Sequence, residues 1–233
     1  IILVGEIEEG SHCELVYFER SRLVLMLFLF DMDNVLYDYQ WRIRMDRLTA
    51  LTGHDLHELR RRWWHDAGEW AAEAGDPPTG AEYLQRVNSA LESDISVPDW
   101  LTHRRAGMTA RPSIIDVARE ASRHGDGAVL TNYGALIGEH LGEIAPELLD
   151  VFGDNLFATA HFGARKPDPM VFQRAIDHLG HKASQTLFVD DLPENVRGAE
   201  TLGITGHWFS PNQSAEELRG ALQAFITRTP QLG

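Results

Sequence analysis

A continuous apolar run that ends at an aspartate is the feature that most restricts how this chain can fold. Residues 23–30 are all apolar, and Asp31 follows them directly. The run is far shorter than the roughly 18 residues that a membrane-spanning helix needs. Its length and its lack of alternation are typical of a strand that is covered on both faces. We therefore predict that residues 23–30 form a central strand of a parallel sheet.

The sequence after residue 111 also favours a parallel sheet, because short apolar segments alternate there with longer segments of helical period. Pro112 begins one such helix, and a glycine follows several of the others. This alternation is typical of an α/β fold with right-handed crossovers, a Rossmann-like, doubly wound parallel sheet. The expected strands are 128–131, 156–159, 186–189 and 206–209, and the expected helices are 113–124, 134–142, 169–179, 195–202 and 216–227.

The segment directly after the first strand has a different pattern. Apolar residues recur at helical spacing in residues 39–107, Gly53 and Asp55 mark the end of one helix and the start of the next, and Asp76–Gly80 is a clear break. The segment shows no strong strand. We predict an α/β core domain formed by residues 23–38 and 108–233, with a helical domain, 39–107, inserted after the first strand.

The first residues of the chain fit this pattern poorly. Residues 1–22 lack a clear hydrophobic period. We predict that they are an extension outside the core domain and that deletion of residues 1–25 leaves activity intact. An extra strand over residues 14–18 is the alternative.

The amino-acid composition restricts which binding partners and which cellular compartment can be expected. The formal net charge of -14 repels a nucleic-acid backbone, and the short arginine run 60–62 has acidic neighbours, so no nucleic-acid polymer is expected. The single cysteine, Cys13, cannot form a disulfide within the chain, which suits the cytoplasm. No apolar run is long enough to span a membrane. We expect a monomer or homodimer that acts on a small molecule.

Two aspartates follow the first strand. In an extended chain the side chains of Asp31 and Asp33 project to the same side. One carboxylate can then attack a phosphorus atom while the other moves protons. Two aspartates that only cap a turn give the same pattern, and for this motif alone that interpretation is the stronger one.

Polar residues also follow three later strands. Thr131 and Asn132 can hold phosphoryl oxygens near a helix N-terminus, and Lys166 can offset the charge of a phosphate. An ordinary helix cap and a solvated loop lysine are the alternatives. Asp190 and Asp191 are adjacent acids at the end of an apolar strand, which is costly unless they bind a cation such as Mg²⁺. Because ligands bind beyond the carboxyl ends of parallel strands, the four segments together predict one phosphate and metal site.

The segments DMDNVLYD, LTN, RKPD and FVDDLPEN resemble, in this order, the four signature motifs of the haloacid dehalogenase superfamily of phosphatases. The resemblance extends over residues 26–209, and the helical insertion is similar to the α-helical cap of that superfamily. GARKPDPMVF and VDDLPENVRGAETLGI are most similar to a branch that contains sugar-phosphate phosphatases. DMDNVLY, in which Asn34 replaces a usual glycine, is also similar to the motif of pyrimidine nucleotidases. The resemblance implies a Mg²⁺-dependent hydrolase of a small phosphoric monoester, either a sugar phosphate or a nucleotide.

The resemblance also implies a role for each motif residue. Asp31 would be the nucleophile, forming an aspartyl-phosphate, and a Mg²⁺ ligand. Asp33 would be the general acid and base, and its backbone carbonyl would ligate the metal. Thr131 and Asn132 would hold the phosphoryl group, and Lys166 would orient Asp31. The other members of the predicted site are the metal ligands Asp190 and Asp191 and the supporting residues Asn34 and Asn195.

Aromatic and basic residues in and near the insertion are candidates for contact with the substrate. Tryptophans at helical spacing more often pack in a core. An arginine near the return from the insertion could bind a second anionic group, but it is expected at the surface. The candidates are Trp63, Trp64, His65, Trp70, Tyr37, Tyr39, His103, Arg104 and Arg105, whereas His161 is expected to be structural.

Three other functions fit parts of this pattern. A dehalogenase of the same superfamily attacks carbon and needs neither Asp33 nor a cation site. A phosphomutase shares the phosphoenzyme but transfers the phosphoryl group to a second sugar phosphate. A binding or regulatory domain would carry the motifs without turnover, and a panel of phosphate esters would separate it from an enzyme.

Overall fold

The structure is a computed structural model that describes residues 26–229. The predicted extension, residues 1–22, and the first residues of the predicted first strand lie outside the described part. Among residues 26–229, no helix is long and apolar enough to cross a bilayer.

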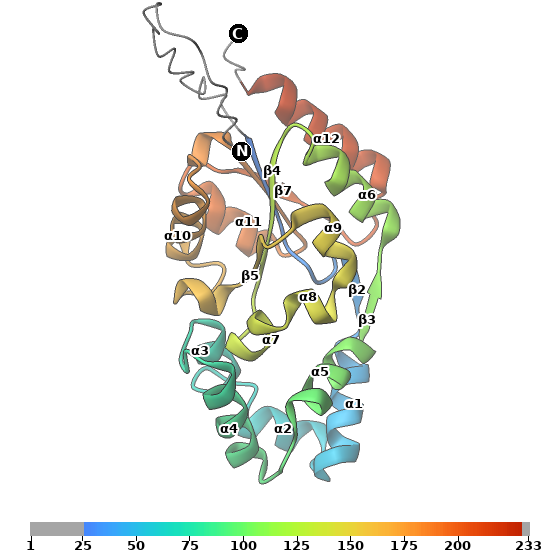
Figure 1. Cartoon of the computed structure of the whole chain (residues 1–233), viewed down its shortest axis with the longest axis vertical. Helices are drawn as coiled ribbons and strands as arrows, with labels where there is room; N and C mark the ends of the chain where they lie inside the picture. The colour runs from blue at the N-terminus through green and yellow to red at the C-terminus, as the bar shows by residue number, and fades with distance from the viewer. Residues whose placement is uncertain (1–25, 230–233) are drawn as a thin grey trace, which may run out of the picture.

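Within this part, a five-stranded parallel sheet forms the centre of the core (Figure 1). Its strand order changes direction at the central strand, so that two strands lie on each side of it. This is the topological switch point at which open α/β sheets bind ligands. The predicted α/β class is confirmed. The strands, in spatial order, are β5 (Leu156–Ala158), β4 (Gly125–Thr131), β1 (Met26–Phe30), β6 (Thr186–Asp190) and β7 (Thr205–Trp208).

The side chains of β1 alternate between two apolar clusters on opposite faces of the sheet. Leu27 and Leu29 pack with residues of α10 (Pro169–Leu179) and α11 (Pro193–Glu200). Phe28 and Phe30 belong to the other cluster, which includes residues of α6 (Pro112–Ala121) and α12 (Ala215–Arg228). Both faces are therefore buried, which explains why the apolar run of β1 is unbroken.

Helices α1 to α5, called the insertion below, lie together at one end of the molecule (Figure 1). Their boundaries follow the local signals. Gly53, at a φ of 75°, ends α1, and the side chains of Asp55 and Thr79 accept backbone N–H groups at the starts of α2 and α4. The helices are α1 (Trp41–Thr52), α2 (Leu56–Arg62), α3 (Glu69–Glu73), α4 (Gly80–Leu91) and α5 (Val97–Ala106).

A short antiparallel ribbon joins the insertion to the core, and the sequence pattern does not predict it. Strand β2 (Tyr37–Tyr39) pairs with β3 (Met108–Ala110). Tyr39 and Met108 thus belong to one hinge, although the helical pattern places Tyr39 in the helical segment. Strands of three residues have no detectable period, and these two become neighbours only when the insertion folds back.

Several predicted elements have different boundaries, and two of these differences are the most informative. Strand β4 begins at Gly125, before the predicted start, because the missing side chain lets the backbone approach the carbonyl of Met26. The predicted helix 134–142 is divided into α7 (Ala135–Glu139) and α8 (Leu141–Ile144), with His140 between them. The remaining short elements are η1 (Pro146–Leu148), α9 (Leu149–Phe152), η2 (Thr159–Phe162) and η3 (Ala183–Gln185).

Candidate active site

The segments that follow β1, β4 and β6 meet at one cavity of about 210 Å³ at the carboxyl edge of the sheet. Every residue of the predicted site lines this cavity except Asp190, which is fully buried beside it. A larger cavity of about 320 Å³ lies near Pro78 and His161, but the single carboxylate of its lining, Glu139, accepts the backbone N–H of Gly80. The smaller cavity is lined by Asp31, Asp33, Asn34, Tyr39, Thr131, Asn132, Lys166, Asp191, Leu192 and Asn195.

Lys166 bridges two carboxylates beside this cavity. Its Nζ atom lies 2.8 Å from Oδ1 of Asp31 and 2.7 Å from Oδ2 of Asp190, and its side chain is only 1% exposed. Burial lowers the pKa of Lys166, but the charges of Asp190 and Asp31 outweigh burial and raise it. The ammonium is therefore charged and fixed between the two acids.

The backbone of Lys166 is fixed as well. The side-chain oxygen of Asn132 accepts the N–H of Lys166 over 2.9 Å, and the Asn132 amide donates to the carbonyl of Lys166 over 3.1 Å. The amide of Asn132 thus serves first to position the lysine. Whether its other groups hold a phosphoryl oxygen stays a prediction, as it does for Thr131, which ends β4 with its side chain buried.

The carboxylates of Asp31, Asp190 and Asp191 form an acidic cluster, with ligand oxygens that lie within 4.8 Å of one another. Asn195 donates to both oxygens of Asp190, over 3.0 and 3.1 Å. Burial raises the pKa of Asp31 well above its usual range; the ammonium of Lys166 opposes this rise, and the charge of Asp190 adds to it.

The donor set of this cluster fits a magnesium ion. Three carboxylates share one ammonium, so a divalent cation would balance the charge that burial makes costly. Carboxylate oxygens are also the ligands that Mg²⁺ prefers.

Asn34 supports this cluster from the turn after β1. Its backbone has a φ of 58°, in the left-handed region that glycine and asparagine tolerate better than other residues. This conformation directs its side chain to Asp191, whose Oδ2 accepts the amide over 3.0 Å. A glycine could adopt the same backbone but could not make this bond.

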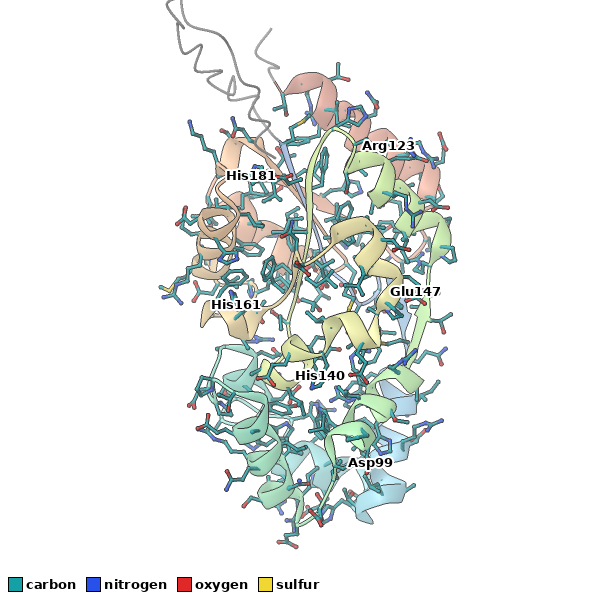
Figure 2. All side chains as sticks on the ribbon, in the orientation of Figure 1. Asp99, Arg123, His140, Glu147, His161 and His181 are labelled. Carbon is teal, nitrogen blue, oxygen red and sulfur yellow. The ribbon has the colours of Figure 1, made fainter. Side chains whose placement is uncertain are left out.

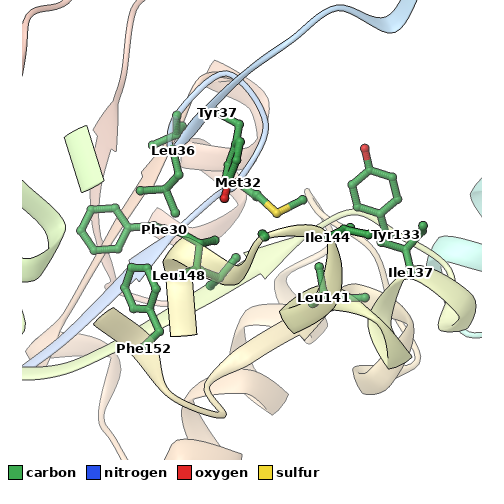
Figure 3. Close-up of a cluster of buried hydrophobic side chains, with 14 of the residues drawn as sticks. Phe30, Met32, Leu36, Tyr37, Tyr133, Ile137, Leu141, Ile144, Leu148 and Phe152 are labelled. Atoms are coloured by element: carbon green, nitrogen blue, oxygen red, sulfur yellow. The ribbon is translucent and has the colours of Figure 1, made fainter. Parts of the chain in front are cut away.

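The side chain of Asp33 turns away from the acidic cluster and is held from two other directions. Nη2 of Arg104 donates to its Oδ1 over 2.5 Å, and the hydroxyl of Tyr133 donates to its Oδ2 over 2.5 Å. Figure 3 shows the ring of Tyr133 at the edge of the apolar cluster near Ile137, with its hydroxyl directed away from that cluster. Each of its two oxygens thus accepts one hydrogen bond, and the carboxyl group is held in one orientation.

Of these two partners of Asp33, the sequence pattern singled out Arg104 as a candidate for substrate contact but did not single out Tyr133. Arg104 was expected at the surface, and this is wrong: it is fully buried between the rings of Tyr39 and Tyr133. The position of Tyr133, directly after the predicted pair Thr131 and Asn132, was a usable signal. No local signal indicated that Arg104 is buried, because its burial depends on how the insertion packs on the core.

The comparison with protein families agrees with this geometry. The family described as haloacid dehalogenase-like hydrolase matches residues 25–203. The chain belongs to this family.

Two phosphatases and one solved enzyme resemble the chain over most of its length. A phosphatase of Mycobacterium tuberculosis is 26% identical over 77% of this chain and 84% of its own length. The ribulose-1,5-bisphosphate 5-phosphatase of Halopiger xanaduensis is 24% identical over 86% of this chain and 91% of its own. A family enzyme of Bacteroides thetaiotaomicron, solved with magnesium and inorganic phosphate, has the same fold, with a TM-score of 0.70 at 17% identity over 83% of this chain and 98% of that one. The chain is therefore a hydrolase of the haloacid dehalogenase-like family that acts on phosphate esters.

Most of the insertion residues that were candidates for substrate contact do not line the cavity of this haloacid dehalogenase-like site. Trp63 is buried and donates to Glu69, and Trp64 stacks on Trp100. Trp70 is 44% exposed and lies under the guanidinium of Arg165. Tyr37 donates to Glu147. Among the candidates, only Tyr39 is part of the cavity lining.

His161 does not line the cavity that holds the acidic cluster either. Its ring packs against Phe157 and Phe162 on the core side of the junction with the insertion (Figure 2). It lines the larger cavity rather than the one that holds the acidic cluster.

Proposed function

We propose that this hydrolase is a magnesium-dependent phosphatase that cleaves a small phosphate monoester through an aspartyl-phosphate on Asp31. The observation that carries the proposal is the placement of Lys166 between Asp31 and Asp190, with Asp191 beside them on the wall of one cavity. A carboxylate nucleophile, a fixed ammonium and a set of cation ligands in one place suit attack on a phosphate dianion.

Each residue of the proposed active site has a separate role in the reaction. Asp31 attacks the phosphorus atom in line with the leaving oxygen, and Lys166 reduces the repulsion between this carboxylate and the phosphate. Thr131 and backbone N–H groups after β4 hold the phosphoryl oxygens. Asp33, in its protonated form, gives a proton to the leaving oxygen and then takes one from the water that hydrolyses the acyl-phosphate.

The magnesium ion would be held by the carboxylates of Asp31, Asp190 and Asp191 and by the backbone carbonyl of Asp33. When bound, it supplies positive charge that stabilises the phosphoryl oxygens. Asn34 and Asn195 orient the ligands Asp191 and Asp190 through the hydrogen bonds described above.

We further propose that the insertion acts as a cap that closes over the cavity and excludes water. Three contacts support this assignment by tying it to the core: Arg104 with Asp33, Arg165 with Glu73 over 2.6 Å, and the side chain of Glu139 with the N–H of Gly80. The β2–β3 ribbon would be its hinge. A sugar phosphate or nucleotide is the substrate class that we propose, consistent with the ribulose bisphosphate phosphatase among the relatives.

The test is phosphate release from sugar phosphates, nucleotides and p-nitrophenyl phosphate, with Mg²⁺ and with EDTA. The wild type is compared with Asp31→Asn and with Asp46→Asn, an exposed aspartate on α1. We expect Mg²⁺-dependent release that is lost in Asp31→Asn and retained in Asp46→Asn. After acid quench, mass spectrometry should locate a phosphoryl group on Asp31.

Equal release from Asp31→Asn would remove Asp31 from its role. Transfer to a second sugar phosphate without release of phosphate would identify a mutase, and no turnover of any ester would favour a binding domain. Release that persists in EDTA would contradict the magnesium requirement alone.

A further inference from the structure

Two arginines are buried where the insertion meets the core, and several of their donors have no partner. Arg44 on α1 is 2% exposed and Arg104 on α5 is fully buried. Among residues 26–229, no hydrogen-bond partner exists for Nε and Nη2 of Arg44 or for Nε and Nη1 of Arg104. The hydroxyl of Tyr39 and Nε1 of Trp100 are buried without a partner in the same part of the structure. Buried donors without an acceptor are rare and costly.

These donors belong to one cluster. The helices α1 and α5 lie side by side (Figure 1). The guanidinium of Arg104 lies 4.2 Å from the ring of Tyr39, and that of Arg44 lies 4.9 Å from the ring of Trp100. The charge of Arg44 acts to lower the pKa of Arg104, although Asp33 outweighs both this charge and burial. Two like charges are thus held near each other in a part of the protein that is buried from bulk solvent.

The nearby carboxylates do not satisfy these donors. Asp33 accepts only Nη2 of Arg104 and the hydroxyl of Tyr133. Glu69, on α3, has its Oε2 occupied by Nε1 of Trp63 and the hydroxyl of Tyr83. The cluster therefore has more donors than acceptors, which is the condition for binding an anion.

The cluster lies directly behind the wall of the active-site cavity. Asp33 and Tyr39 both line that cavity, and both contact Arg104. Tyr39 is also the last residue of β2, the hinge strand that leads into the insertion. Tyr39 and Asp33 therefore separate the Arg104 guanidinium from the cavity, and a substrate group would reach it by displacing the ring of Tyr39.

We propose that Arg44, Arg104 and Tyr39 form a subsite for a second anionic group of the substrate, either a carboxylate or a second phosphoryl group. This inference rests on the proposed function and narrows its substrate class. Planar guanidinium groups match carboxylate and phosphate oxygens through paired hydrogen bonds.

The test compares substrates that differ only in this second group. The carboxylate arm is 3-phosphoglycerate against glycerol 3-phosphate, and the phosphate arm is fructose 1,6-bisphosphate against fructose 6-phosphate. We expect kcat/KM to favour the doubly anionic member of at least one pair by about tenfold or more, since a site built for a polar group discriminates strongly against its absence. The arm with the larger ratio identifies the group.

Substitutions in the cluster test whether its residues cause the preference for the doubly anionic substrate. In Arg44→Met and in Tyr39→Phe, which removes only the hydroxyl, the ratio within the preferred pair should fall severalfold. In Arg42→Met, an exposed arginine on the same helix, the ratio should equal that of the wild type. Calorimetry on Asp31→Asn measures the binding of the same pairs without turnover, and it should show the same preference.

The possible outcomes test the anion subsite separately from the proposed phosphatase activity. Release of phosphate without preference for either doubly anionic compound, or with a preference that Arg44→Met and Tyr39→Phe retain, would overturn the subsite and leave the phosphatase intact. The donors would then be satisfied by buried water. No release from any ester would overturn the function, and equal calorimetric affinities within both pairs would independently overturn the subsite.

Discussion

The side chain of Asn132 pairs with both backbone polar groups of Lys166, accepting over 2.9 Å and donating over 3.1 Å. This pairing sets the position from which the ammonium reaches Asp31 and Asp190. In Asn132→Ala the loop can shift, and a displacement of about 1 Å is enough to reduce kcat by about a hundredfold. We expect kcat to fall more than KM rises, measured by phosphate release.

A matched control for this variant is Asn155→Ala. The Asn155 amide also donates to a backbone carbonyl, that of Gly127, but away from the cavity. It should lower the free energy of unfolding by about 1–3 kcal/mol without a matching loss of kcat. An unchanged kcat in Asn132→Ala would show that Lys166 needs no such support.

The hydroxyl of Tyr133 holds the acid and base Asp33 and should matter for turnover. Tyr133→Phe keeps the ring and removes one of the two hydrogen bonds that position Asp33, so we expect kcat to fall about tenfold or more. Tyr37→Phe is the control, because Tyr37 is also buried and also donates to a carboxylate, that of Glu147. Equal losses in the two variants would refute a specific role for Tyr133.

Asp190 and Asp191 should differ in what they contribute to the metal site. Asp191 makes no ion pair with Lys166 within the described residues, so Asp191→Asn should raise the half-saturating Mg²⁺ concentration by about 10–100-fold with little change in stability. Asp190→Asn also breaks a buried pair with Lys166, and should cost about 3 kcal/mol of unfolding free energy as well. Thermal unfolding with and without Mg²⁺ measures both effects, with Asp46→Asn as the control. Similar stability of the two variants without Mg²⁺ would contradict this division.

The burial of Glu73, whose carboxylate pairs with Arg165, should make stability depend on pH. Burial, reinforced by the charge of Glu69, raises the pKa of Glu73 to about 7 although Arg165 opposes the rise. Between its ordinary pKa of 4.5 and about 7, the folded protein keeps a proton that the unfolded chain has lost. The free energy of unfolding therefore falls as pH rises through this window.

Glu73→Gln removes this contribution. From about pH 5 to about pH 8, the variant should gain on the order of 2–3 kcal/mol of stability relative to the wild type, measured by urea unfolding. Glu200→Gln, an exposed glutamate at the end of α11, should show no such gain. A constant difference between wild type and Glu73→Gln at the two pH values would contradict the raised pKa.

The left-handed backbone at Asn34 gives a further prediction. Asn34→Gly and Asn34→Ala both lose the hydrogen bond to Asp191, but only alanine is strained at a φ of 58°. Asn34→Ala should therefore be less stable than Asn34→Gly by about 1 kcal/mol in chemical denaturation. Equal stabilities would mean that the turn relaxes to another conformation.

Local patterns were sufficient for much of the fold. The apolar run before Asp31 predicts β1 because both faces of a central strand are buried. The capping residue Asp55 predicts where a helix begins, and the break at residues 76–80 predicts a boundary before the next one. The hinge ribbon was missed because strands as short as Tyr37–Tyr39 and Met108–Ala110 have no period of their own. Their pairing is a property of the folded insertion.

The chemistry at the strand ends follows from the order of the amino acids alone. Asp31, Thr131, Lys166 and Asp190 follow strands of a parallel sheet, and parallel strands present their carboxyl ends at one edge, so their order in the chain already implied a common site. The surroundings of Asp33, in contrast, depend on how distant segments pack in three dimensions. Arg104 and Tyr133 reach its two oxygens from elements far along the chain, and such contacts depend on how the insertion packs against the core. Long-range packing leaves no periodic trace in the sequence, and it is this packing that buried Arg44 and Arg104 behind the cavity.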